Sequence, residues 1–210
     1  MADEPGPRPA PLRPSYPIRT ERLLLRPLTA GDADALLAYR GRPDVSRYVP
    51  FEPMSRDDIL ELIAGRWART ELTDEGQSLT LGAEVAETGL AETGELAGDV
   101  VVFWHSREHA GGELGYVLNP ALGGRGYATE AANAMLRLGF EGIGLHRIVA
   151  RIEERNEPSV KLARRLGMRQ EARLVHNEIF KGEWSTEVDF AMLADEWPAR
   201  RAHFGEVCHG

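Results

Sequence analysis

Cysteine and long apolar segments are scarce in this sequence. Its one cysteine, Cys208, lies close to the last residue, so no disulfide can form within one chain, and a cysteine-based zinc site is excluded. A catalytic thiol is disfavoured there, because tails seldom hold a side chain rigidly. No segment approaches the roughly 20 apolar residues that span a bilayer, which excludes a transmembrane helix. The first residues lack the apolar middle of a signal peptide, so we expect a cytoplasmic protein.

Positive charge is also in short supply. The 210 residues carry 25 Lys and Arg against 33 Asp and Glu, a formal net charge of -8. This balance disfavours unspecific binding to nucleic acid or to an anionic membrane, and we expect neither as a partner. An anionic ligand must therefore be captured locally, against the overall field. The hydrophobic fraction of 42% is that of an ordinary globular protein with room for one substantial core.

Prolines divide the chain. Six of them fall in the first 17 residues, which indicates an extended, flexible arm. We predict an arm over residues 1–18, a single domain over 19–197 and a flexible tail over 198–210. No internal repeat is visible.

Hydrophobic periodicity and turn residues predict the order β-α-α-β-β-β-α-β-α-β-β. A hairpin-rich first half and a central βαβ crossover favour a mixed α/β sheet covered by helices. The expected strands lie in 21–28, 78–87, 96–106, 113–118, 147–152, 169–181 and 185–194, and the expected helices lie in 29–39, 55–67, from 127 and 158–167.

The most informative segment is the glycine-rich turn Gly123-Gly124-Arg125-Gly126-Tyr127-Ala128, between a strand and a helix. The first N–H groups of a helix lack internal partners, and the helix dipole favours an anion there. Glycines let a phosphate approach the backbone closely. The turn alone thus predicts either a pyrophosphate site or a purely structural helix start.

Two other nucleotide-binding patterns do not fit. A P-loop needs Gly-Lys-Ser/Thr at its end, whereas Gly126 is followed by Tyr127 and Ala128. A dinucleotide fingerprint needs a third glycine where Thr129 stands, and the preceding strands form hairpins, unlike a doubly wound sheet.

These residues resemble the GNAT N-acetyltransferases, and within them the RimJ/RimL-like branch. The family's pyrophosphate motif, Gln/Arg-x-x-Gly-x-Gly/Ala, matches Gly123–Ala128 except at its first place, and the branch's Gly-Tyr-Ala-Thr-Glu-Ala stands at 126–131. Asn156-x-x-Ser159 followed by Leu166-Gly167-Met168 is similar to a second family segment. The opening ERLLLRPLTAGDADAL fits the branch's first strand and helix. The resemblance covers about residues 19–195.

The resemblance implies a mixed, mostly antiparallel seven-stranded sheet flanked by about four helices, with a splayed central strand pair. It also implies acetyl-CoA as cosubstrate, with backbone N–H groups near Val117 and Leu118 directed at the thioester carbonyl. The cofactor residues that it implies are Tyr116, Val117, Leu118, Gly123, Gly124, Arg125, Gly126, Tyr127, Ala128, Thr129, Asn156, Ser159 and Lys161.

Acetyl transfer needs a base that neutralises the amine and benefits from an acid that protonates the thiolate. Glu113 is the candidate base; the alternative is that it forms a structural ion pair. Ser159 is the candidate acid near the sulfur; the alternative is that Asn156 and Ser159 cap a helix. Lys161, Arg164 and Arg165 form either a solvated helix face or a group of which one contacts the 3′-phosphate. No metal spacing is present. Candidate acceptor contacts are Phe51, Glu52, Trp67, His105 and His176.

The predicted function is direct transfer of an acetyl group to a primary amine, with the N-terminal α-amino group of a protein, of ribosomal-protein type, as the favoured acceptor. Two alternatives stay open. One is an enzyme for a small amine, such as an aminoglycoside, a polyamine or an amino acid. The other is a non-catalytic module that senses acyl-CoA. The sequence leaves the oligomeric state open, a homodimer included.

Overall fold

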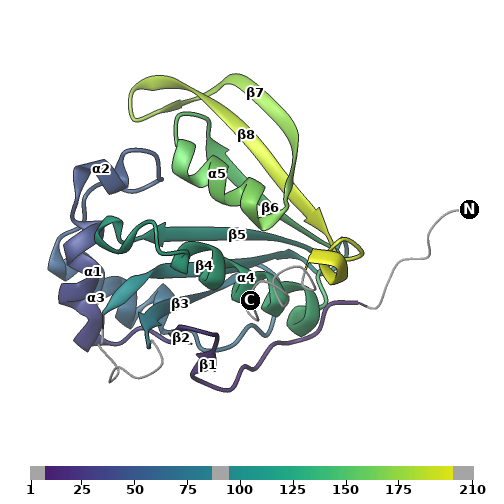
Figure 1. The fold of residues 1–210 in the computed structure, drawn as a ribbon, viewed down its shortest axis with the longest axis horizontal. Helices are drawn as coiled ribbons and strands as arrows, with labels where there is room; N and C mark the ends of the chain where they lie inside the picture. Colours follow the sequence, from purple (N-terminus) through teal and green to yellow (C-terminus); the bar gives the residue numbers. More distant parts are fainter. Residues whose placement is uncertain (1–7, 87–94, 201–210) are drawn as a thin grey trace, which may run out of the picture.

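The computed structural model describes residues 8–86 and 95–200; Cys208 and the ends of the predicted arm and tail lie outside them. Eight strands form one sheet within this part of the chain (Figure 1). They are β1 (Ile18–Arg19), β2 (Leu23–Arg26), β3 (Gln77–Val85), β4 (Leu96–Ser106), β5 (Gly111–Leu118), β6 (Arg147–Glu153), β7 (Arg169–Phe180) and β8 (Glu183–Leu193).

Two of the helices begin at a side chain that caps them. Ser55 accepts a hydrogen bond from the Asp58 N–H at the start of α3, and Asn156 accepts one from the Ser159 N–H at the start of α5. The α-helices are α1 (Ala33–Arg40), α2 (Pro43–Ser46), α3 (Arg56–Ala64), α4 (Tyr127–Arg137) and α5 (Glu157–Leu166). The 3₁₀-helices are η1 (Ala30–Asp32), η2 (Arg66–Ala68) and η3 (Pro120–Leu122), and η4 (Leu138–Ile143) is a π-helix that follows α4 directly.

The sheet order is β1-β2-β3-β4-β5-β6-β8-β7, and β5 with β6 is its parallel pair. That pair is in register only from Gly111↔Arg147 to Glu113↔Val149, after which the two strands diverge (Figure 1). The mostly antiparallel sheet and the splayed central pair are therefore confirmed. The eighth strand is β1. It is two residues long and therefore too short to produce a periodic pattern in the sequence.

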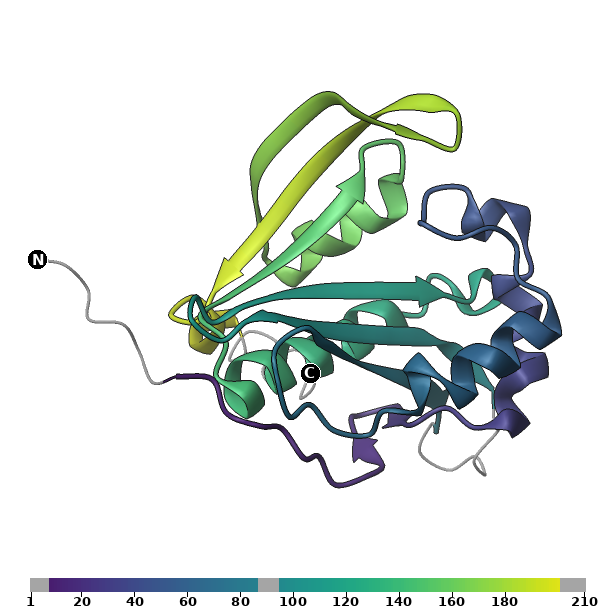
Figure 2. The same cartoon turned by 180° about the vertical axis from the view of Figure 1, so that it is seen from behind.

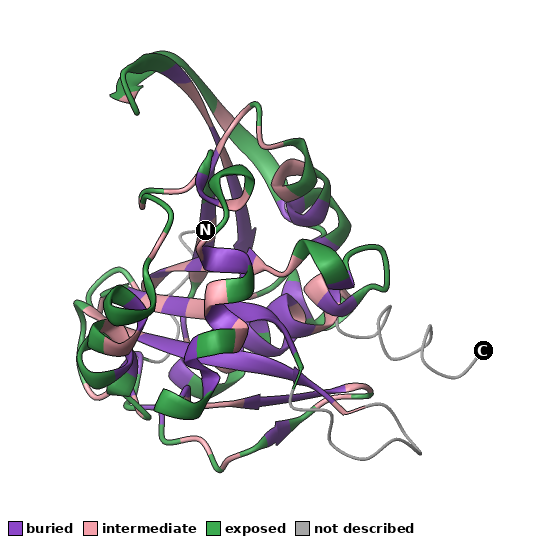
Figure 3. Ribbon diagram, turned by 90° about the vertical axis from the view of Figure 1, so that its left-hand side faces the viewer, coloured by how far each residue is buried: buried purple, intermediate pink, exposed green. Residues whose placement is uncertain are grey.

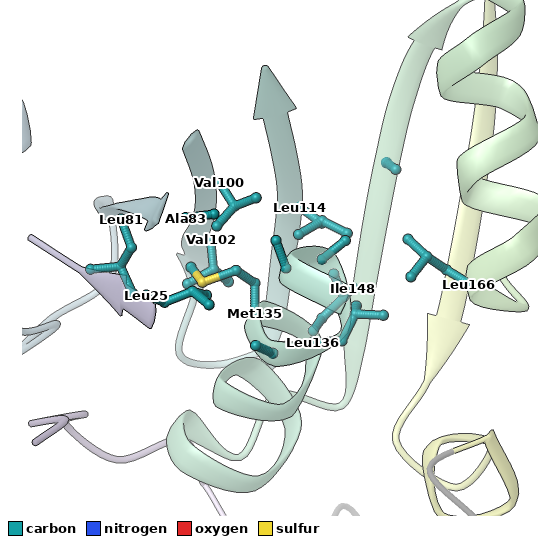
Figure 4. Close-up of a cluster of buried hydrophobic side chains, with 14 of the residues drawn as sticks. Leu25, Leu81, Ala83, Val100, Val102, Leu114, Met135, Leu136, Ile148 and Leu166 are labelled. Atoms are coloured by element: carbon teal, nitrogen blue, oxygen red, sulfur yellow. The ribbon is translucent and has the colours of Figure 1, made fainter. Parts of the chain in front are cut away.

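Helices cover both faces of the sheet (Figure 2). On one face, α4 and α5 pack over a core in which Met135 points towards Leu25 and Val102, and Leu136 towards Ile148 (Figure 4). On the other face, α1, α3 and η2 enclose a smaller core. Beyond β6, the long β7–β8 hairpin is largely exposed and curls towards α2 (Figures 1 and 3).

The proline-rich segment does not extend freely from Arg8 onwards, which corrects the expectation of a flexible arm for this part. Leu12 is buried and forms an isolated bridge with Leu72, and the Tyr16 hydroxyl donates to the Thr70 carbonyl at 2.8 Å. The apolar side chains between the prolines anchor the segment to the domain. No helix within residues 8–86 and 95–200 is long and apolar enough to cross a bilayer.

Candidate active site

The glycine-rich turn forms the N-terminal approach to α4. Gly124 and Gly126 have φ angles of 78° and 85°, in the left-handed region that favours glycine. Gly126 is the N-cap of α4, and its carbonyl accepts from the N–H groups of Thr129 and Glu130. The N–H groups of Tyr127 and Ala128, which precede these bonded residues in the helix, point out of the helix end, in the arrangement that binds anions.

A cleft of about 950 Å³ opens over this turn. Arginine side chains gather in its lining, although the net charge of the whole chain is -8. Arg22 holds the turn in place, since its Nη1 donates to the Arg125 carbonyl at 2.8 Å and its Nη2 lies 2.8 Å from a Glu130 carboxylate oxygen. The guanidinium groups that line the cleft belong to Arg19, Arg22, Arg137, Arg165 and Arg200.

The cleft also contains an unsatisfied acceptor. Asn133 Oδ1 on α4 is buried and has no hydrogen-bond partner among the described residues, although Asn133 lines the cleft. Next to it along the helix, Thr129 Oγ1 accepts from Arg165 at 3.3 Å. A buried carbonyl oxygen without a partner suits a ligand with an N–H donor, such as the amides of pantetheine or an adenine amino group. The cleft thus fits acetyl-CoA in charge, in backbone geometry and in hydrogen bonding.

Six of the expected cofactor residues do not line this cleft; four of them line the second cavity described below, and Lys161 and Arg125 line neither. Lys161 pairs with Glu157 one helical turn away at 2.8 Å, is exposed, and does not line the cleft. The helix-face interpretation therefore describes Lys161, and Arg165 on the same helix faces the cleft instead. The exposed Arg125 side chain is not part of the cleft lining, whereas its backbone carbonyl anchors Arg22.

The splay of β5 from β6 leaves backbone donors without a strand partner. The Asn119 N–H donates to the Ala97 carbonyl, and alternate residues of a strand address opposite neighbours. The N–H of Val117 therefore faces β4, and those of Tyr116 and Leu118 face β6 beyond the last paired residues. Of the two expected oxyanion donors, the N–H of Leu118 points into the gap where β5 and β6 diverge, whereas the N–H of Val117 is on the side that pairs with β4.

A second cavity, of about 460 Å³, lies on the other side of the same strand end. Tyr116 and Val117 line this acceptor cavity, whereas Leu118 lines the cofactor cleft, so consecutive residues at the end of β5 line the two spaces. The walls of the acceptor cavity come from the loop at residues 48–51, from η2, from β3 to β6, from the start of α5 and from the β7–β8 hairpin.

Glu113, the expected base, is at the centre of a three-residue cluster. One of its carboxylate oxygens accepts from Arg151 at 2.5 Å and contacts His105 Nε2 at 2.9 Å. The Glu113 side chain is 22% exposed and lines the acceptor cavity. Glu113 is thus both a partner in a structural ion pair and the candidate base. His105, whose ring stacks on Phe103, contacts the site through Glu113.

Asn156 and Ser159 also line the acceptor cavity, and Asn156 caps α5 as expected. Tyr116 reaches across the gap between β5 and β6 and donates its hydroxyl to the Ser159 carbonyl at 3.2 Å. Burial raises the pKa of Tyr116 to about 12, so the phenol keeps its proton at neutral pH. Tyr116 therefore presents a second O–H group beside Ser159.

Phe51 and Trp67 line the acceptor cavity, but their rings hold an arginine of this chain. The Arg40 guanidinium lies 4.7 Å from each ring centroid. Its Nε is 2.9 Å from Asp99 Oδ1, which also accepts from the Tyr39 hydroxyl at 2.7 Å. Burial and the Asp99 charge raise the pKa of Tyr39 well above its ordinary value, so Tyr39 remains a donor.

The other two acceptor candidates lie outside the cavity lining. Glu52 is exposed and pairs with Lys181 of the hairpin turn at 3.2 Å. The Lys181 ammonium also donates to the carbonyls of Ser46 and Phe51, at 2.8 and 2.7 Å, which ties the hairpin to the loop after α2. His176 is exposed at a bulge of β7, where its ring stacks on Trp184.

Several site residues could not be identified from the sequence. The alternation of side chains along a strand could have placed Glu187 and Ser185 on one face of β8, but it could not have shown that this face lines the cavity. Trp197 and Arg200, at the end of the domain and in the expected tail, fold back to line the cofactor cleft, and no local pattern signals that contact. The residues missed by sequence reasoning are Tyr39, Arg40, Asp99, Asn133, Arg137, Arg151, Glu178, Glu187, Trp197 and Arg200.

Comparison with known proteins agrees with this geometry. A family model described as "Acetyltransferase (GNAT) domain" matches residues 22–169. The chain is 33% identical over 181 residues to the uncharacterized N-acetyltransferase YnaD of Bacillus subtilis, covering 86% of this chain and 98% of that protein. It is 25% identical over 114 residues to spermidine N(1)-acetyltransferase of Escherichia coli, covering 54% and 61%.

A solved structure is equally similar. The crystal structure of a GNAT-family acetyltransferase from Bacillus anthracis superposes with a TM-score of 0.73 at 30% identity, covering 85% of this chain and 99% of that one. Fold and site together define an acyltransferase that uses a CoA thioester. The chain belongs to the GNAT acetyltransferase family and is an N-acetyltransferase of that type.

Proposed function

We propose that this enzyme transfers an acetyl group from acetyl-CoA directly to a cationic primary amine small enough to enter the acceptor cavity. The observation that supports the proposal best is that consecutive residues at the end of β5 line two cavities. One has the charge and backbone geometry for a pyrophosphate, and the other is lined by carboxylates. Both reactants can therefore reach the N–H groups of Tyr116 and Leu118 at the same time, without an acetylated enzyme.

Acetyl-CoA supplies an activated carbonyl carbon as a thioester. The unpaired N–H of Leu118, with that of Tyr116, would stabilise the negative charge that develops on the carbonyl oxygen. Glu113 would take the proton of the acceptor ammonium, either directly or through water, with Arg151 and His105 fixing its position. Ser159, or the protonated phenol of Tyr116 beside it, would donate a proton to the departing sulfur.

The α-amino group of a protein N-terminus, which the RimJ/RimL-like motif at 126–131 favours, is a second acceptor candidate. The bounded acceptor cavity favours a small amine over it, and a relative of this chain is described as a spermidine N(1)-acetyltransferase. The branch, the cytoplasmic location and the absence of a nucleic-acid partner remain predictions from the sequence.

The test is release of free CoA thiol from acetyl-CoA over a panel of monoamines, polyamines, aminoglycosides, amino acids and N-terminal peptides. We expect turnover with at least one cationic amine, and double-reciprocal plots that intersect, as a ternary complex requires. Saturable acetyl-CoA binding without turnover on any acceptor would support a sensing module instead. Parallel plots together with an acetylated enzyme in the mass spectrum would contradict direct transfer.

A further inference from the structure

The acceptor cavity carries more negative than positive side chains. Five carboxylates line it against three guanidinium groups. The carboxylates belong to Asp99, Glu113, Glu153, Glu178 and Glu187, and the guanidinium groups to Arg40, Arg66 and Arg151.

Three of the five carboxylates already have cationic partners. Two of these pairs are those with Arg40 and Arg151 described above. The third is Glu153, whose side chain is 6% exposed and lies 2.9 Å from Arg155 Nε. Of the charged groups in the lining, these pairs leave Arg66 and two carboxylates.

Glu178 of β7 and Glu187 of β8 remain. Within residues 8–86 and 95–200, neither has an ion pair at 4.0 Å or less. Burial and the charges of Asp189, Glu178 and Glu113 raise the pKa of Glu187, and Arg151 opposes the shift only partly. Burial is the main cause of the raised pKa, and the neighbouring carboxylates add repulsion that a bound cation would relieve.

The position of these carboxylates relative to the reaction point follows from strand register. Counting along the parallel pair from Glu113↔Val149 puts Glu153 level with Val117. Glu187 is the antiparallel partner of Glu153, so it lies two strand spacings from the end of β5 at the same level. That separation is about 10 Å in a regular sheet, and the splay of β5 from β6 increases it.

We propose that the acceptor is a linear aliphatic amine with a second ammonium group, which binds between Glu178 and Glu187 while the first amine lies at the end of β5. The assignment rests on the proposed function and adds the class of its acceptor. A slender chain is favoured because Lys181 ties the hairpin to the loop after α2 and so bounds the cavity on its far side.

The experiment compares kcat/KM for putrescine, ethylenediamine and n-butylamine, with the thiol-release assay described above. Putrescine should exceed n-butylamine by roughly ten- to a hundredfold, the effect of one hydrogen-bonded charge. Ethylenediamine, too short to reach the hairpin, should gain no such advantage. In the double variant Glu178→Gln/Glu187→Gln the ratio of putrescine to n-butylamine should fall to near parity.

A matched control is Glu108→Gln, which removes an exposed carboxylate in the turn between β4 and β5, outside the cavity lining. It should keep the wild-type ratio. Equal kcat/KM for the diamine and the monoamine in the wild type, or a ratio that survives the double variant, overturns the inference. Activity on N-terminal peptides alone would also overturn the inference of a diamine acceptor, while it would still support transfer of the acetyl group to an amine. The absence of turnover with every amine would count against the proposed function itself.

Discussion

Arg40 of α1 and Asp99 of β4 form a buried, two-pronged ion pair behind the reaction point. Arg40 Nε lies 2.9 Å from Asp99 Oδ1, and Nη2 lies 2.5 Å from Oδ2, with the side chains 6% and 2% exposed. Asp99 is also the register partner of Val117 on β5. The pair therefore joins α1 to the part of β4 that pairs with the end of β5, where the N–H groups of Tyr116 and Leu118 face the gap between β5 and β6.

Asp99→Asn should destabilise the fold by about 3–5 kcal/mol, because it leaves the Arg40 charge buried without its counterion. Chemical denaturation measures the change in the free energy of unfolding. The control is Asp44→Asn, which breaks a pair of the same geometry with Arg42, at 2.8 and 2.9 Å, on the exposed surface. Asp44→Asn should change the stability little; equal losses from both variants would contradict a special role for the buried pair.

Gly126→Ala should weaken CoA binding on the order of tenfold. A left-handed φ costs an L-residue about 1–2 kcal/mol, and the added Cβ would lie 3.2 Å from Arg22 Nη2, so relaxation displaces the turn amides. Calorimetric titration with CoA measures the effect. Gly76→Ala places the same strain at φ 77° in a turn far from the cleft. If both variants bind CoA as tightly as the wild type, the cofactor cleft is wrongly assigned.

Glu113→Gln should lower kcat/KM by about a hundredfold, and most strongly below the pKa of the acceptor amine. A base is needed most where the amine is charged. The pH–rate profile is therefore the decisive measurement, with Glu108→Gln as the charge control. A profile that keeps the wild-type shape in Glu113→Gln would leave Glu113 as a structural partner of Arg151 and transfer the role of base to water.

Lys181→Met should raise the KM for the acceptor severalfold while changing kcat less. The ammonium has three oxygen partners on the loop after α2, and without them the wall of the acceptor cavity loosens. Hydrogen exchange should then accelerate in residues 46–52. Lys161→Met is the matched control, since this lysine pairs with Glu157 on the surface of α5. Exchange rates unchanged in Lys181→Met would contradict the idea that Lys181 holds the wall.

Glu187→Gln should raise the melting temperature near neutral pH. The folded-state pKa of Glu187 is raised by burial and by Asp189, Glu178 and Glu113, so ionisation costs the folded state more than the unfolded one. The cost is present above the raised pKa and disappears as the pH falls through it. The gain should therefore vanish towards about pH 4, where the unfolded carboxyl is itself half protonated. A gain of equal size at both pH values would point to packing instead.

Local signals in the sequence identified the elements of this fold well. Alternation and capping residues located the strands and the helices, since Ser55 and Asn156 act within one helical turn. The glycine-rich turn was identifiable because a left-handed φ at Gly126 selects glycine whatever lies nearby. Contacts between distant segments could not be identified in this way. Lys161 and Arg165 carry the same charge on one helix, and the orientation of α5 in the fold decides that Arg165 faces the cleft.

The family, the reaction class and the helix end expected to bind the cofactor could be identified from the sequence, because they depend on residues close together in the chain. Which charges meet in the acceptor cavity depends on contacts between distant segments. Glu113, Glu178 and Glu187 come from three strands, and the register that brings them together is set by the whole sheet. The balance of charge in that cavity, and with it the choice of amine, arises from long-range packing.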